Sequence, residues 1–174
     1  MVRLFAGSPM PDAAKLTFYR PDFYGKFAKA LTQEAMRGPS AWSVGDRELM
    51  AAYVSKINEA PFCIGAHTAT AAAAYDDLTL VASVLADLDT APIEAPLRET
   101  LRMLGALSRD GSVSAADMRA VLDAGASPAQ VHDALAVAFA FNVTDRLANA
   151  FDFEVLDDEG FEEGAKYLLK RGYR

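Results

Sequence analysis

The sequence contains no window of alternating β-branched and polar residues that would specify a β-strand, and alanine is its commonest residue. A half-buried strand needs a period of two, whereas alanine is the best helix former. Glycine and proline occur between helical segments, where they end one helix or begin the next. The pattern therefore predicts an all-α fold.

The chain has 174 residues, of which 52% are hydrophobic and 24% are charged. These values are typical of a globular protein, and the length favours one domain over residues 1–174. Seventeen Lys and Arg against twenty-four Asp and Glu give a net charge of -7. This charge disfavours binding to nucleic acid phosphates or to an anionic membrane surface.

Cys63 is the only cysteine, so no intrachain disulfide can form. The N-terminal stretch MVRLFAGSPMPDAAK has no apolar segment of the length that a signal peptide needs. No apolar run approaches the ~20 residues of a membrane span. Together these features predict a cytoplasmic protein.

Capping residues, glycines and prolines divide the chain into successive helices. A helix over 22–37 should end at Gly38-Pro39, and Ser43 with Asp46 should cap the next one. Pro61 is costly inside a helix but favourable in its first turn, so one helix should end near residue 59 and another begin at 60–61. Further helices are expected over 77–88, 96–108, 114–125 and 128–151, with a short last helix around 167–169.

Three residues near Pro61 could carry chemistry. Cys63 lies in the first turn of its helix, where free amides and the positive dipole end favour a thiolate. His67 follows at i+4 on the same helix face. Glu48, near the start of the preceding helix, would complete a proton relay if the two helices fold back on each other.

Each residue also has a purely structural interpretation. A lone cysteine in an apolar helix is usually a small buried hydrophobe, and a lone histidine is usually a satisfied core or surface residue. Glu48 in a first turn can simply interact favourably with the positive end of the helix dipole. The spacing alone leaves both interpretations open.

The pattern Glu48-x11-Ala60-Pro61-Phe62-Cys63-x3-His67 resembles the signature of the carboxymuconolactone decarboxylase and alkylhydroperoxidase D family. In its peroxidase branch a Glu is followed by Cys-Pro-x-Cys and then by His at these spacings. The later Phe141-Asn142-x3-Arg146-Leu147-Ala148 is similar to the late-helix pattern of peroxidase-related members. The resemblance covers roughly residues 20–155.

The resemblance implies an alkylhydroperoxidase D-like helical bundle that assembles as a homo-oligomer, a trimer or hexamer. It also implies that Cys63 attacks hydrogen peroxide or an organic hydroperoxide, with His67 and Glu48 relaying protons. No cofactor or metal is implied. The family's resolving cysteine is replaced here by Ala60, so turnover would need an external thiol or a protein reductant.

Two alternatives remain. A decarboxylase-like lyase could use Glu48 and His67 on a small carboxylated lactone, with Arg146 and Asn142 as substrate-binding residues. A catalytically silent oligomeric binding protein would keep only the fold and the pocket. A metal site is disfavoured because only Cys63 and His67 have a ligand-like spacing, and His132 is expected to be exposed.

Overall fold

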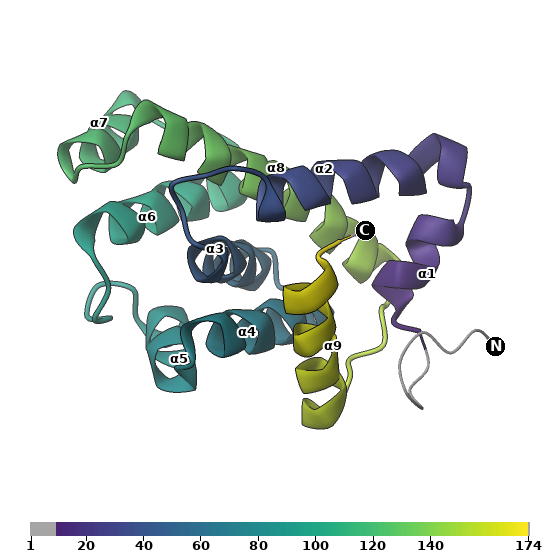
Figure 1. Cartoon of the computed structure of the whole chain (residues 1–174). Coiled ribbons are helices and arrows are strands. Elements are labelled where there is room, and N and C mark those ends of the chain that lie inside the picture. The colour runs from purple at the N-terminus through teal and green to yellow at the C-terminus, as the bar shows by residue number, and fades with distance from the viewer. Residues whose placement is uncertain (1–9, 174) are drawn as a thin grey trace.

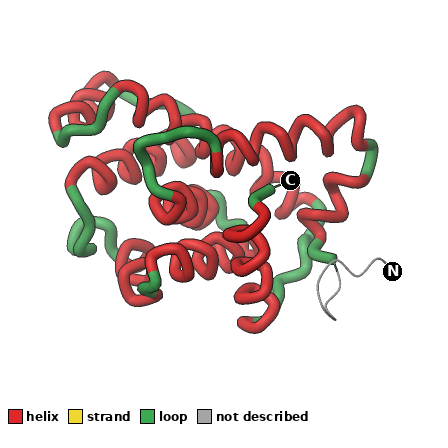
Figure 2. The backbone as a smooth tube through the Cα atoms, in the orientation of Figure 1, coloured by secondary structure: helices red, strands yellow, loops and turns green. Residues whose placement is uncertain are grey.

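A computed structural model describes residues 10–173, and all regular structure in that range is helical (Figure 1). The tube view contains helices and loops but no strand over these residues (Figure 2). The all-α prediction is therefore confirmed for the described part of the chain. In chain order the elements are α1 (Asp12–Phe18), the π-helical turn η1 (Pro21–Gly25), α2 (Lys26–Arg37), α3 (Val44–Ile57), α4 (Pro61–Tyr75), α5 (Leu78–Ala86), α6 (Ala95–Asp110), α7 (Ala115–Asp123), α8 (Pro128–Ala150) and α9 (Asp158–Arg171).

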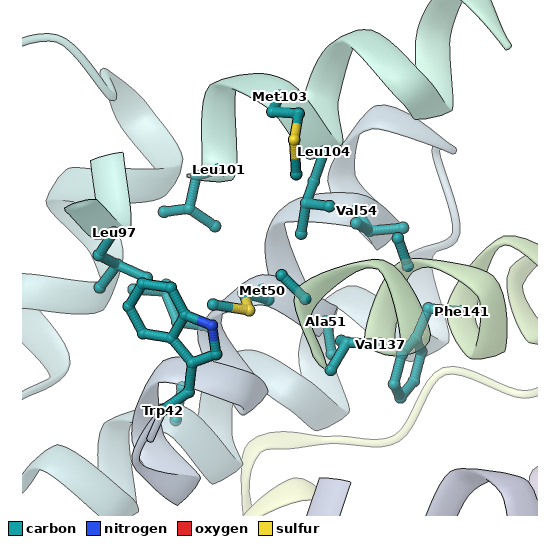
Figure 3. Packing of buried hydrophobic residues seen from close by; sticks show 14 of the residues in the cluster. Trp42, Met50, Ala51, Val54, Leu97, Leu101, Met103, Leu104, Val137 and Phe141 are labelled. Carbon is teal, nitrogen blue, oxygen red and sulfur yellow. The ribbon is translucent and has the colours of Figure 1, made fainter. Parts of the chain in front are cut away.

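Helix α3 lies at the centre of the molecule and contacts α4, α6 and α8 (Figure 1). Burial extends around most of the circumference of α3, because Ala51, Ala52 and Ser55 are buried as well as Met50 and Val54. A helix that is apolar on nearly all sides belongs in a core. Figure 3 shows the main cluster, which includes Met50 and Val54 of α3 and Leu104 of α6. This packing fixes the helix that carries Glu48.

The capping signals in the sequence are confirmed. Ser43, Ser114 and Ser127 each accept a hydrogen bond from the backbone amide three residues later, and the side chain at that position bonds back to the serine amide. These reciprocal bonds satisfy amides that the first helical turn leaves free. Gly125 ends its helical segment at φ 105°, in the left-handed region that glycine tolerates.

The N-terminal part of the chain departs from the prediction of a single helix over 22–37. Helix α1 precedes that segment, and the segment itself begins with the π-helical turn η1. Arg20, at φ 48°, separates the two helical parts. Asp12 anchors α1 from a distance, because its carboxylate accepts a hydrogen bond from the backbone amide of Glu154. That contact between distant segments has no local sequence signature.

No helix among residues 10–173 is both long enough and apolar enough to cross a membrane. The N-terminal stretch considered for a signal peptide lies mostly outside the described residues.

Helix α9 packs closely against α4 at Gly65 (Figure 1). A methyl group at Gly65 would lie 2.4 Å from the ring of Phe161, well inside van der Waals contact. Phe161 in turn contacts Phe62 of α4, with ring centroids 6.1 Å apart. The glycine therefore permits the approach of α9 to the helix that carries Cys63 and His67.

We expect Gly65→Ala to lower the free energy of unfolding by about 1–3 kcal/mol, because Phe161 would have to leave its position. Urea unfolding monitored by circular dichroism measures the change. The control is Gly164→Ala in α9, where a methyl group would meet nothing within 4 Å. That change should stabilise the protein by up to about 1 kcal/mol through helix propensity. A stabilising Gly65→Ala would contradict the close α4–α9 packing.

Candidate functional site

The turn between α3 and α4 brings Glu48 and His67 together. Asn58 follows the end of α3, Glu59 adopts a left-handed φ of 52°, and Pro61 begins α4. The two helices consequently fold back on each other, and the Nδ1 atom of His67 lies 2.7 Å from Oε2 of Glu48. The expected meeting of these two side chains is confirmed.

Glu48 is fully buried and is held by three other segments of the chain. Arg37, at the end of α2, donates from Nη2 to Oε1 at 2.6 Å. Tyr173, which follows α9, donates its hydroxyl to Oε1 at 2.9 Å, while His67 approaches Oε2. Arg37 and Tyr173 are site residues that no sequence motif indicates. Tyr173 is 125 residues from Glu48, and Arg37, although only 11 residues away, lies on a different helix.

The charge state of Glu48 follows from this setting. Burial alone would raise its pKa, but the hydrogen bond of His67, the charge that His67 has when protonated, and Arg37 together outweigh burial and lower the pKa below its ordinary value. Burial and the Glu48 charge raise the pKa of Tyr173, so its phenol stays protonated and donates. Because Glu48 is ionised, Nδ1 of His67 carries the proton that they share. Within residues 10–173, the hydrogen-bond contacts of the His67 ring are at Nδ1.

Two contacts fix the segment that carries Tyr173. The amide of Tyr173 donates to Oε1 of Gln33 at 2.8 Å, and Arg37 donates to the carbonyl of Leu168 at 3.2 Å. Gly172 has φ 68°, and a methyl group there would meet Gln33. Glycine is therefore required for the turn that places the phenol on Glu48.

Cys63 lies in the first turn of α4, as predicted, but its surroundings differ from the expectation. The thiol is 1% exposed, and its polar neighbour is Asp145 of α8. Burial raises the pKa of Cys63 far above its ordinary value, and the Asp145 carboxylate raises it further. The prediction that the start of the helix favours a thiolate is wrong for this state, because burial and a nearby negative charge oppose ionisation.

Asp145 is a site residue that the sequence analysis misses. Its carboxylate is completely buried and accepts hydrogen bonds from Ser55 at 2.9 Å and from Asn58 at 2.8 Å. Burial raises its pKa, and these hydrogen bonds only partly offset that effect. One feature of the sequence could have indicated Asp145. It is an acidic residue four positions after Phe141 and three before Ala148, which places it on the buried face of α8.

Arg146 and Asn142 do not line the cavity, although Asn142 accepts a hydrogen bond from Asn58, which also donates to Asp145. Arg146 is exposed and donates to the carbonyl of Asn142 on its own helix at 2.7 Å. Asn142 donates to Ser108 and to the carbonyl of Ala138. Neither residue lines the cavity, so the predicted substrate-binding pair is not brought to it. His132 is exposed, as expected.

An apolar cavity of about 220 Å³ opens against Cys63 and His67. Its walls come from α1, α2, α4, α8, α9 and the loop before α9. Aromatic rings form much of the surface, including Phe62, Phe141 and Phe161, and the ring of Phe141 meets that of His67 at 4.3 Å between centroids. Glu48 lies behind His67 and does not line the cavity. Within residues 10–173 no group of three or more His, Cys, Asp or Glu is placed to hold a metal ion.

Two crystal structures share this arrangement of helices. An uncharacterized peroxidase-related protein from Silicibacter sp. TM1040 matches with a TM-score of 0.79 and 24% identity, over 87% of this chain and 78% of that protein. A second, described as an alkylhydroperoxidase AhpD core from Ralstonia eutropha JMP134, matches with a TM-score of 0.77 and 21% identity, over 88% and 80%. The chain has the alkylhydroperoxidase D core fold. No family model and no curated protein matches the sequence.

The fold prediction made from the Glu, Pro, Cys and His spacing is thus confirmed. Within this fold the chain carries Ala60, fully buried, at the position where the resemblance places a resolving cysteine. Cys63 has no second thiol in the chain to react with.

Glu48→Gln should lower the free energy of unfolding at neutral pH by about 3 kcal/mol or more, because the buried Arg37 loses its counter-charge. The pKa of Glu48 is lower in the folded than in the unfolded protein. Its stabilising effect is therefore complete above the ordinary carboxyl pKa and is lost as the pH falls through the folded-state value. Urea unfolding from pH 7 down to about pH 3 measures both effects.

The difference in stability between wild type and Glu48→Gln should shrink in acid. The control is Glu162→Gln on α9, whose carboxylate is largely exposed and lies 3.9 Å from Lys166. It should change stability by less than about 0.5 kcal/mol. A pH-independent difference for Glu48→Gln would show that Glu48 is not charged in the folded protein.

Asp145→Asn should speed the alkylation of Cys63 by iodoacetamide at neutral pH. Removing the carboxylate removes a charge and a hydrogen bond that both raise the thiol pKa. Each unit by which that pKa falls increases the thiolate fraction about tenfold. Mass spectrometry of the single cysteine gives the rate, and Asp152→Asn at an exposed position is the control. An unchanged rate would mean that Asp145 does not suppress the thiolate.

Proposed function

We propose that this protein reduces organic hydroperoxides through Cys63, with His67 and Glu48 moving protons. The observation that carries the proposal is that Cys63 and His67 line one apolar cavity while a buried, ionised Glu48 holds Nδ1 of His67. A thiol, an imidazole and an orienting carboxylate are the three groups that this kind of thiol activation uses. The peroxidase-related descriptions of the two similar structures agree with it.

The resting state in this proposal is the thiol, because burial and Asp145 raise the pKa of Cys63. Nε2 of His67 accepts the thiol proton, and the resulting imidazolium is stabilised by Glu48. The thiolate attacks the terminal oxygen of the hydroperoxide, a sulfur–oxygen bond forms and the oxygen–oxygen bond breaks. The departing alkoxide takes the proton from His67, giving an alcohol and a sulfenic acid on Cys63.

In this step sulfur loses two electrons and the hydroperoxide gains them. Because Cys63 is the only cysteine, regeneration needs thiols from outside the chain. A first external thiol condenses with the sulfenic acid, releasing water and forming a mixed disulfide. A second thiol then releases Cys63 and leaves as the disulfide of the two external thiols.

The apolar wall supports this chemistry over the lactone decarboxylase alternative. A small carboxylated lactone is polar throughout, and most of its oxygens would face Phe62, Phe141 and Phe161 without hydrogen-bond partners. Arg146, the residue expected to bind its carboxylate, lies outside the cavity. An organic hydroperoxide carries one polar group, which Cys63 and His67 would face.

The test is a brief stoichiometric pulse of cumene hydroperoxide followed by a dimedone-type sulfenic acid trap and intact-mass detection. The single cysteine makes the adduct unambiguous. We expect rapid trapping in the wild type and none in Cys63→Ser. The rate should rise with pH from neutral to alkaline conditions, because the high thiol pKa leaves the thiolate fraction still increasing there.

His67→Gln should slow trapping about 100-fold, since it removes the proton acceptor, whereas His132→Gln should have no effect because His132 is exposed and remote. Glu48→Gln should slow trapping as well, provided that circular dichroism shows the variant folded. If folded wild type gives no adduct while the urea-unfolded chain does, Cys63 is a packing residue. The silent binding protein would then be the better account.

A further inference from the structure

Lys29 is the only lysine, arginine, aspartate or glutamate among the cavity-lining residues that the structure describes. It projects from α2, on a face that also contributes Ala28 and Thr32 to the wall. Within residues 10–173 no carboxylate lies within ion-pair distance of its ammonium group. Its contact is with an aromatic ring, because Nζ lies over the ring of Phe18.

The charge of Lys29 lies at the rim of the cavity. Its Nζ atom is 5.6 Å from the ring centroid of Phe18, which lines the cavity and is 59% exposed. Cys63, by contrast, is 1% exposed and His67 is 5% exposed. The cavity therefore has a cation where it opens, apolar walls, and the sulfur and imidazole on its buried side.

An apolar ligand alone would leave the ammonium group of Lys29 without a counter-charge, and a small anion alone would leave the apolar walls without contacts. A molecule with a carboxylate at one end and an aliphatic chain satisfies both, because the chain removes apolar surface from water while the carboxylate pairs with the lysine. We propose that this cavity binds an amphipathic monocarboxylate, with its carboxylate at Lys29 and its chain directed towards Cys63.

Binding of the monocarboxylate does not depend on the reactivity of Cys63. The assignment of a substrate rests on the proposed function, and it narrows the substrates to aliphatic carboxylic acids that carry a hydroperoxide group along the chain. Because Lys29 lies at the rim and Cys63 is buried, the oxygen–oxygen bond must be several carbons away from the carboxylate. A peracid, in which the two groups coincide, would not fit.

The experiment is isothermal titration calorimetry of the reduced full-length chain with decanoate, below its micelle concentration, and separately with decan-1-ol as a neutral analogue. We expect one decanoate per chain, with affinity falling from decanoate to octanoate to hexanoate. Lys29→Met should weaken the binding of decanoate about tenfold and leave the affinity for decan-1-ol unchanged, since only the carboxylate interacts with the charge. Lys26→Met, an exposed lysine on the same helix that does not line the cavity, is the matched control.

A second variant locates the ligand. Gly164 lines the cavity with free space beside it, so Gly164→Leu should fill the space and abolish binding of both ligands. Binding that survives Gly164→Leu would place the ligand on the exposed surface and overturn the proposal. If Lys29→Met weakened the binding of decanoate and decan-1-ol equally, or weakened neither, the proposal would also be overturned.

These outcomes are separate from those of the proposed function, because calorimetry needs no oxidation of Cys63. Decanoate binding with an inert Cys63 would leave the carboxylate site standing and remove the peroxidase. A reactive Cys63 without decanoate binding would leave the proposed peroxidase standing and remove the carboxylate site.

Discussion

The buried carboxylate of Glu48 joins the four parts of the chain on which the site depends. It belongs to α3 and accepts from Arg37 at the end of α2, from His67 in α4 and from Tyr173 after α9. An ionised group removed from water is costly unless its hydrogen-bonding capacity is met. The approach of α2, α4 and the segment after α9 to α3 is thus a condition for burying this charge. Fold stability and the orientation of His67 have a common cause.

The two buried carboxylates of the site have opposite pKa shifts, and the difference assigns them different roles. Glu48 is surrounded by positively charged and strongly donating partners, so its pKa is lowered and it orients His67. Asp145 accepts from the neutral side chains of Ser55 and Asn58, so burial dominates and its pKa is raised. Beside Cys63 it opposes thiolate formation. In the proposed function the thiol therefore gives its proton to His67 and not to Asp145.

The parts of this structure that the sequence predicts are those set by local interactions. Serine caps, Gly38 and Pro61 fix helix ends within one turn of the chain, and the turn at Pro61 suffices to bring Glu48 to His67. Tyr173 reaches Glu48 across 125 residues, and Arg37 reaches it from the end of another helix, so no spacing rule relates either residue to Glu48. The protonated state of Cys63 could not be predicted either, because it depends on burial and on a residue of another helix.

In the proposed function, the parts of the chain that select the substrate differ from those that carry the chemistry. Glu48, Cys63 and His67 lie within residues 20–155, where the family resemblance is found, but much of the cavity wall does not. Residues 11–18 form one wall, and residues 156–173 form another. A chain can therefore keep the same thiol, imidazole and carboxylate while the flanking helices change what reaches them. For this reason the motif indicates a reaction class, and the identity of the ligand has to be argued from the walls and from Lys29.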